Sequence, residues 1–386
     1  MRRDLIVVGG SIVGASLCLA SRGLAIALVA RQRPAAAAFA AQDHDSRVYA
    51  LSPGSVEFLS KIGVWQTIPG ERLTPVYAMQ VCGDERRAEI GFDAYRAGVP
   101  ELAWIVEDRE LQAALWRGLD AQQGLEIFLP ESCSGLELGE TARVTLGDGR
   151  QLEADLVVGA DGADSFVRAA AGIAARETPY GQSAVVANFA CERAHGNVAM
   201  QWFQGGPVLA LLPLPGDRVS MVWSLPQARA AQVMNLEASA LAEAVCAASG
   251  AALGSLAALG APQAYPLRRL VAAQLVAPHL ALAGDAAHVI HPLAGQGLNL
   301  GLQDAAALAA TLAGREAVRR CGDLRLLRRY ERERSEAILA MRVGVHGLHA
   351  LFAAHGETAR RVRTLGLNLT DRLPVLKNIL LRHALR

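Results

Sequence analysis

The sequence predicts an α/β fold in which an antiparallel sheet is inserted into a Rossmann-like domain. Residues 5–30 follow a strand–turn–helix–strand pattern, and apolar runs at 156–158 and 280–283 each lead into a turn containing glycine and aspartate. Short apolar runs of this kind are typical of parallel strands buried on both faces. Residues 181–225 instead carry aromatic and β-branched residues around a Pro-Gly-Asp turn, which indicates antiparallel sheet.

The composition agrees with a large folded protein. The chain has 386 residues, of which 52% are hydrophobic and 19% charged, and its formal net charge is +1. This length allows two or three domains, and the balanced charge gives no reason to expect nucleic acid as a partner. The cysteines lie far apart without metal-ligand spacing, so we expect reduced thiols, no metal site and a cytoplasmic location. No apolar run reaches the ~18 residues that a membrane span needs.

The first strand–helix turn matches the dinucleotide fingerprint only in part. Gly9 and Gly14 have the expected spacing, but Ser11 replaces the glycine at which the backbone meets a pyrophosphate. The acid expected to bind a ribose at the end of the second strand is also absent, because the chain there has Ala30-Arg31. The alternative to dinucleotide binding is an ordinary tight turn.

Further elements follow in order along the chain. A helix is predicted to begin at Ser52-Pro53, with serine as N-cap and proline at the first helical position, and to end at Gly63. Residues 142–158 predict a hairpin whose second arm leads into the buried strand, and residues 227–260 are rich in alanine and predicted to be helical. The buried strand breaks at Asp161-Gly162, for which an ordinary turn is the alternative to a binding loop.

The segment 284–304, GDAAHVIHPLAGQGLNLGLQD, is the most informative part of the chain. An acid follows an apolar strand, a loop without periodicity comes next, and a helical pattern then begins. The acid can accept hydroxyl hydrogen bonds, and the helix start supplies unpaired N–H groups and about half a positive charge. This layout is typical of a polar-cofactor site. We expect His288 and His291 to be structural, and no catalytic residue is assigned.

Together these pieces resemble the flavin-dependent aromatic hydroxylases, the group A FAD monooxygenases, and within them the ubiquinone-biosynthesis hydroxylase family UbiH/UbiF/VisC. The matching pieces are the turn at 9–14, residues 47–52, the segment 155–168 and above all 284–304. The resemblance implies a para-hydroxybenzoate hydroxylase-like fold. It divides the chain into a discontinuous FAD-binding domain at 1–75, 100–180 and 265–340, a β-rich substrate domain at 76–99 and 181–264, and a C-terminal helical segment at 341–386.

The resemblance also implies a long FAD site. Its expected residues, from the ADP end to the flavin ring, are Gly9, Ser11, Ile12, Val13, Gly14 and Arg31, then Arg47, Arg109, Asp161 and Gly162, then Gly284, Asp285, Pro292, Gly295, Gln296, Gly297, Leu298 and Asn299. Arg47 and Arg109 would reach the FAD phosphates or ribityl chain, and Asp285 would accept from the ribityl chain. Solvated surface positions are the alternative for both arginines.

The reaction implied by the resemblance is hydroxylation of the aromatic ring of a polyprenylated ubiquinone precursor, with NAD(P)H and O2, through a C4a-hydroperoxyflavin. NAD(P)H would bind transiently near the flavin. An apolar pocket would exclude water, and its candidate lining residues in the inserted sheet are Met200, Trp202, Phe203, Leu211, Pro213, Leu214 and Trp223. Plain sheet core is the alternative for each of them.

Two alternatives for the function remain open. One keeps the fold but changes the chemistry, to a hydroxylase of another aromatic substrate or a flavin reductase. The other is a flavin-weak accessory protein of a quinone-biosynthesis complex, which Ser11 and Ala30 motivate.

The C-terminal residues suggest a membrane contact. Residues 360–386 contain seven Lys/Arg and one acid, Asp371, among many leucines. A basic amphipathic end suits the cytoplasmic face of a membrane, where a polyprenylated substrate resides. The alternative is a helix packed on its own domain or on a protein partner.

Overall fold

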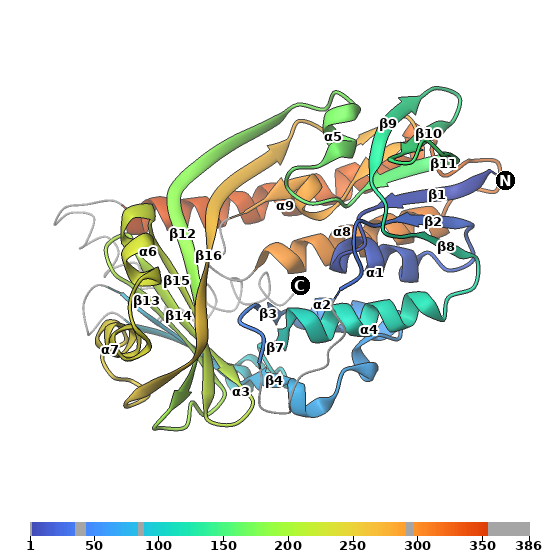
Figure 1. The fold of residues 1–386 in the computed structure, drawn as a ribbon. Coiled ribbons are helices and arrows are strands. Elements are labelled where there is room, and N and C mark those ends of the chain that lie inside the picture. Colours follow the sequence, from blue (N-terminus) through green and yellow to red (C-terminus); the bar gives the residue numbers. More distant parts are fainter. Residues whose placement is uncertain (1, 35–43, 84–88, 291–295, 354–386) are drawn as a thin grey trace.

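The computed structural model describes residues 2–34, 44–83, 89–290 and 296–353. Its strands form three sheets (Figure 1). The first sheet contains, in spatial order, β17 (Val276–Ala277), β18 (Leu280–Leu282), β11 (Gln151–Gly159), β1 (Arg3–Val8), β2 (Ile26–Val29) and β8 (Leu125–Phe128), with β10 (Ala142–Leu146) beside β11 and β9 (Cys133–Leu138) beside β10.

The second sheet also has eight strands, and the third has three. The second contains, in spatial order, β19 (His288–Val289), β16 (Leu256–Ala272), β12 (Ala175–Cys191), β15 (Arg218–Pro226), β14 (Val208–Leu214), β13 (Val198–Phe203), β5 (Ala78–Cys82) and β6 (Glu89–Asp93). The third contains β3 (Val48–Leu51), β7 (Ala103–Glu107) and β4 (Thr74–Val76). We call the second sheet the inserted sheet.

The helices complete these layers. They are α1 (Ile12–Ala20), α2 (Pro53–Lys61), α3 (Ala94–Ala97), α4 (Asp108–Asp120), α5 (Phe166–Ala170), α6 (Gln227–Met234), α7 (Ala238–Ala248), α8 (Gln296–Ala313) and α9 (Leu324–Ala353), with short 3-10 turns η1 (Trp65–Thr67), η2 (Gly70–Arg72) and η3 (Gly284–Ala286). Helices α6 and α7 lie against the inserted sheet, and α1, α4, α8 and α9 lie near the first sheet (Figure 1). None of the helices in the described ranges is long and apolar enough to cross a membrane.

The predicted parallel unit forms the centre of the first sheet. β1 pairs in parallel with both β2 and β11, and β11 pairs in parallel with β18. The turn after β1 requires glycine at two positions. Gly9 has a φ of +114°, and a Cβ there would lie 2.2 Å from the Ala160 carbonyl oxygen. A Cβ on Gly14 would lie 2.0 Å from the Gly9 carbonyl oxygen, so the glycines let β1, α1 and the end of β11 meet closely.

One face of the inserted sheet packs against helices. Successive side chains of a strand point to opposite faces, and on one face Leu209, Leu211, Met221 and Trp223 pack with the core formed by α6 and α7. Its two longest strands, β12 and β16, run side by side over 17 residues each and reach toward the first sheet (Figure 1).

The structure adjusts two predicted boundaries. The alanine-rich stretch 227–260 is not helical throughout, because it contains α6, α7 and then the first residues of β16. The strands of the inserted sheet span 78–93 and 175–289, so they extend beyond the expected substrate segment 181–264 at both ends. The division into two domains at the expected boundaries stays a prediction.

Candidate functional site

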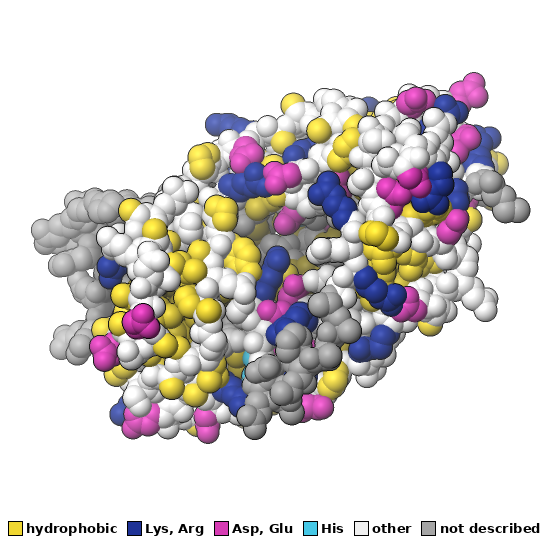
Figure 2. Space-filling model, in the orientation of Figure 1, with side chains coloured by type: hydrophobic (Ala, Val, Ile, Leu, Met, Phe, Trp, Pro, Cys, Tyr) yellow, Lys and Arg dark blue, Asp and Glu magenta, His cyan; other side chains and the backbone are white. Residues whose placement is uncertain are grey.

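A cavity of about 1100 Å³ lies between the first, second and third sheets. Figure 2 shows this face of the molecule hollowed near its middle, with basic and acidic side chains close to the hollow. Ligand pockets usually measure about 300–1,000 Å³, so there is room for a large cofactor together with a substrate. The cavity extends from the start of α1, past β3 and α4, to the start of α8 and the inserted sheet.

The start of α1 forms one end of the cavity. Gly9, Ser11, Ile12 and Val13 line it, as expected for the ADP end of a dinucleotide site. Ser11 is the N-cap of α1, but its hydroxyl makes no capping hydrogen bond. The first backbone bond of the helix runs from Ala15 N to the Ser11 carbonyl, so the preceding amides are available to an anion.

Gly14 does not line the cavity. It lies behind the turn, where its missing side chain makes room for the Gly9 carbonyl. Its role in the site is therefore the shape of the turn and not contact with a ligand. Trp116 supports the same turn by donating from Nε1 to the Gly10 carbonyl at 2.9 Å.

The end of β2 differs from an ordinary ribose site, as the sequence indicates. Ala30 is buried, while Arg31 lines the cavity together with Glu131 and Cys133, which the sequence did not single out.

Burial raises the pKa of the Cys133 thiol to about 12, and the nearby charges of Asp161 and Glu131 act in the same direction. The thiol is thus neutral at physiological pH.

Asp161 and Gly162 also line the cavity, at the end of β11. Asp161 Oδ2 accepts from Val167 N at 3.1 Å, but its buried Oδ1 has no hydrogen-bond partner among the described residues. A buried acceptor without a partner is costly, and a hydroxyl-bearing ligand in the cavity would satisfy it. Arg168 ties this loop to η3 by donating to the carbonyls of Ala163 and Ala286, both at 2.8 Å.

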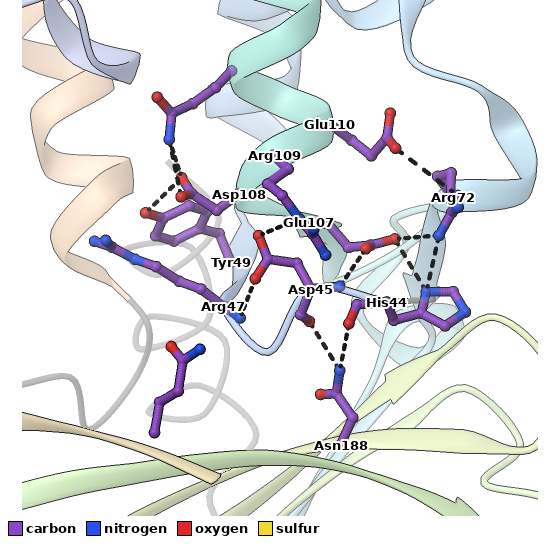
Figure 3. Close-up of polar contacts among 12 residues, drawn as sticks. His44, Asp45, Arg47, Tyr49, Arg72, Glu107, Asp108, Arg109, Glu110 and Asn188 are labelled. Atoms are coloured by element: carbon purple, nitrogen blue, oxygen red, sulfur yellow. Dashed lines mark hydrogen bonds and ion pairs between the residues drawn. The ribbon is translucent and has the colours of Figure 1, made fainter. Parts of the chain in front are cut away.

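Arg47 and Arg109 enter the middle of the cavity from two sides (Figure 3). The Arg47 guanidinium lies 5.5 Å from the ring centre of Tyr49 and 5.9 Å from that of Tyr265. No described carboxylate lies within ion-pair distance of it. Arg109 Nε lies 3.2 Å from Asp45 Oδ2. Both arginines therefore present positive charge to the cavity, which fits the phosphates of a dinucleotide.

The start of α8 and the turn η3 form the other end. Gly284 and Asp285 of η3 line the cavity with Gly297 and Leu298 of α8. Burial raises the pKa of Asp285, although His288, Arg47 and Arg268 oppose this shift. Its side chain nevertheless opens into the cavity and can accept hydrogen bonds there.

The remaining residues expected around the flavin ring have other positions. Pro292 and Gly295 lie outside the described residues, as does His291, and Gln296 is described only as the first residue of α8. Asn299 does not line the cavity. Its side chain accepts from Ser52 N and donates to the Ala50 carbonyl, both at 2.8 Å, so it joins α8 to β3 and α2.

A buried ionic cluster lies behind η3, and no sequence motif marks it. Asp304 Oδ2 accepts from Gly284 N at 2.9 Å and lies 2.6 Å from His288 Nε2, while Oδ1 accepts from Arg334 Nε at 2.7 Å. Asp304 is the last residue of the informative segment, but its partner Arg334 lies in α9 and has no sequence motif. The cluster holds the backbone of η3, and His288 is part of it.

The inserted sheet contributes a wall of small and aliphatic side chains. Val208, Ala210, Leu212, Val222 and Ser224 line the cavity, with Met79, Ala184, Val186, Ala199, Met200 and Gln201 beside them.

Of the seven residues expected in the pocket, Met200 lines the cavity and the other six do not. Trp202, Leu211 and Trp223 pack with the α6 and α7 core, and Phe203 and Pro213 are buried within the sheet. Leu214 packs with Val76 and Ile105 of the third sheet. In β14 and β15 the lining residues alternate with the residues packed on the helices, so Leu211, Pro213 and Trp223 are one position out of register with the wall.

Comparison with known proteins agrees with this geometry. A family model described as "FAD binding domain" matches residues 2–342. The chain is 35% identical to 3-demethoxyubiquinol 3-hydroxylase of Escherichia coli, over 99% of the chain and 98% of that protein. It is 32% identical to the ubiquinone hydroxylase UbiL of Rhodospirillum rubrum, over 99% of the chain and 89% of that protein.

Solved structures share the fold. PqsL of Pseudomonas aeruginosa has a TM-score of 0.79 at 23% identity, covering 96% of the chain and 100% of that protein. The p-nitrophenol 4-monooxygenase PnpA of Pseudomonas putida has a TM-score of 0.78 at 16% identity, covering 100% of the chain and 98% of that protein. The expected fold, that of FAD-dependent aromatic hydroxylases with an inserted sheet, is confirmed.

Proposed function

The chain belongs to the FAD binding domain family and, within it, to the UbiH/UbiF/VisC hydroxylases, and on this premise we propose that it hydroxylates the aromatic ring of a polyprenylated ubiquinone precursor. The co-substrates are NAD(P)H and O2. The single observation that supports this most is that one cavity joins the dinucleotide turn of α1 to the apolar wall of the inserted sheet. A cofactor and a lipophilic ring can therefore meet in the same space.

The cavity residues fit FAD along its length. The start of α1 and the arginines Arg47 and Arg109 would hold its phosphates, and Asp285 would accept from the ribityl hydroxyls. When bound, FAD supplies the activation of O2 that no side chain can perform. The first turn of α8, at Gly297 and Leu298, provides a positive helix end that favours negative charge by roughly 0.3–2 kcal/mol.

The wall of the inserted sheet suits an apolar aromatic substrate. Val208, Ala210, Leu212 and Val222 present aliphatic groups to the cavity. Such a wall binds a ring through burial of apolar area and keeps water away from the reacting atoms. Ser224 and Gln201 add polar groups that can orient ring oxygens.

We also propose a peripheral contact with the cytoplasmic membrane through residues 360–386. These residues lie outside the described ranges, and their basic and leucine-rich composition supports the proposal. A contact with other proteins of quinone biosynthesis is the alternative.

Purified protein tests the function directly. We expect the visible spectrum of bound flavin, NAD(P)H oxidation that depends on O2, and growth of a quinone-deficient strain that lacks this hydroxylation step. The intermediate that accumulates in that strain identifies the substrate. A chain that holds no flavin and takes up no added FAD would instead support the accessory-protein alternative that Ser11 and Ala30 motivate.

A further inference from the structure

Asp45 lies where the third sheet, the start of α4 and the inserted sheet meet (Figure 3). Each of its polar groups has a different partner. Its amide donates to Glu107 Oε2 at 2.6 Å, and its carbonyl accepts from Asn188 Nδ2 at 2.9 Å. Its Oδ1 accepts from Arg47 N at 3.0 Å, and its Oδ2 lies 3.2 Å from Arg109 Nε. One carboxylate thus contacts both arginines that enter the cavity.

Glu107 holds Asp45 from the side of α4. Its carboxylate is buried and lies 3.1 Å from His44 Nδ1 and 3.2 Å from Arg72 Nη1. Burial alone would raise the pKa of Glu107, but its contacts with His44, the Asp45 amide and Arg72 lower it by more. Glu107 therefore stays ionised and remains an acceptor for the Asp45 amide.

His44 connects Arg218 to Glu107. Arg218 Nη1 lies 2.8 Å from His44 Nε2, and an arginine can only donate. Nε2 therefore accepts from Arg218, while Nδ1 lies 3.1 Å from Glu107 Oε1 and 3.4 Å from Arg72 Nη1. Arg218 belongs to β15, so this chain of contacts joins the inserted sheet to the start of α4.

Asn188 holds Asp45 from the opposite side. It belongs to β12, is buried, and donates from Nδ2 to the carbonyls of His44 and Asp45 at 3.3 and 2.9 Å. Its contacts reach the backbone of the segment that carries Arg47, so the position of this segment depends on the inserted sheet.

We infer that Asp45 is a positioning residue through which the inserted sheet sets Arg47 and Arg109 for the FAD phosphates. The inference rests on the proposed function, because it requires FAD in the cavity. Asp45 does not line the cavity. It fixes the Arg47 backbone and gives Arg109 a counter-charge, so that the segment carrying Arg47 and the Arg109 side chain are held in place before the cofactor arrives.

The test compares Asp45→Asn, Asn188→Ala and the double variant, using apoprotein titrated with FAD. Asparagine keeps an acceptor for Arg47 N but removes the counter-charge of Arg109, so FAD should bind about tenfold more weakly. Asn188→Ala should weaken binding by a few-fold. Because Asn188 acts through Asp45, the double variant should bind no more weakly than Asp45→Asn alone.

Ser220→Ala is the matched control. Ser220 lies directly across from Asn188 in the β12–β15 ladder, is fully buried, and its hydroxyl has no hydrogen-bond partner among the described residues. Its replacement should leave FAD affinity unchanged.

Salt provides a readout that a merely structural role would not move. Salt screens arginine–phosphate attraction, so the FAD affinity of the parent chain should fall as salt rises. In Asp45→Asn the arginines lose their fixed positions and contact the phosphates less, so its affinity should fall less, whereas removal of the negative charge alone would make the fall steeper.

Three results overturn the inference: unchanged FAD affinity in Asp45→Asn, losses that add in the double variant, or equal salt dependence in the parent chain and Asp45→Asn. A parent chain that binds no FAD at all contradicts the proposed function as well. Failure of the inference alone would leave the parent chain binding FAD normally.

Discussion

Two aspartates of the same segment, Asp285 and Asp304, have opposite roles at the flavin end of the cavity. Burial raises the pKa of Asp285, whose side chain opens into the cavity. Asp304 is fully enclosed, and its oxygens are taken by Gly284, His288 and Arg334. Asp285 is therefore available to a ligand, whereas Asp304 holds the turn that presents Asp285.

Replacement of Asp285 tests its contact with the cofactor. Asp285→Ala removes the acceptor for the ribityl hydroxyls, so the purified protein should contain less FAD per chain, measured from its absorbance. Asp285→Asn keeps one acceptor oxygen and should lose less. Full flavin content in the alanine variant would contradict the assignment.

Asp304 makes the stability of the fold sensitive to acid. Burial alone would raise the pKa of its carboxyl, but His288 and Arg334 lower it by more, so the net shift is downward. A carboxyl with a depressed folded-state pKa stabilises the fold above its unfolded value of about 3.9, and this contribution is lost as the pH falls through the folded-state pKa.

Urea unfolding of Asp304→Asn measures this contribution. The variant leaves Arg334 buried without its counter-charge, so it should lose about 3–5 kcal/mol of unfolding free energy at pH 7. The difference from the parent chain should shrink as the pH drops below about 4. A difference that stays constant from neutral to acid pH would show that the charge of Asp304 is not responsible.

Individual site residues were predictable where backbone chemistry constrains the sequence. Gly9, Asp161 and Asp285 follow buried strands and line the cavity as expected. Asp45 and Arg334 were not predictable, because they act through partners that are distant in sequence. No local pattern marks such pairs.

At the scale of elements, the inserted sheet determines where a substrate can lie. In β14, Leu209 and Leu211 pack with α6 and α7, while Val208 and Ala210 line the cavity. The sequence could indicate a sheet, but not which of its faces packs on the helices and which lines the cavity, since both faces are apolar. The large aromatics Trp202 and Trp223 suggested a pocket, yet they fill the core under the helices.

A matched pair of variants in β14 separates the two faces. Ala210→Phe fills part of the cavity, so kcat/KM for the aromatic substrate should fall while flavin content stays unchanged. Leu211→Phe overpacks the α6 and α7 core and should instead lower stability by about 1–3 kcal/mol. Enzyme kinetics and thermal unfolding of both variants provide the comparison. Equal turnover in Ala210→Phe and the parent chain would exclude this wall from the substrate site.

At the scale of the whole molecule, the sequence predicted the layers better than their connections. The parallel unit, the inserted sheet and the helix after Ser52-Pro53 appear as expected. The third sheet was not predicted, because β3, β7 and β4 pair across long stretches of chain and periodicity carries no information on partners. For the same reason, the sequence did not predict that β12 and β16 pair over 17 residues each.

Deletion of residues 360–386 tests the proposed membrane contact. The basic charge of these residues would attract anionic lipid, so the truncated protein should move from the membrane to the soluble fraction of lysed cells. Flavin content, which depends on the cavity, should be retained. Unchanged membrane association of a truncated, flavin-containing protein would rule out this segment as the anchor.

The central claim is that this chain inserts oxygen into the ring of a ubiquinone precursor by means of FAD. The most direct measurement supplies purified protein with FAD, NAD(P)H, a short-chain prenylated precursor and isotopically labelled dioxygen, and analyses the product by mass spectrometry. The account predicts one labelled oxygen atom in the aromatic ring and no product without FAD. An unlabelled or unchanged ring from a flavin-loaded protein, across the precursors of the pathway, would contradict it.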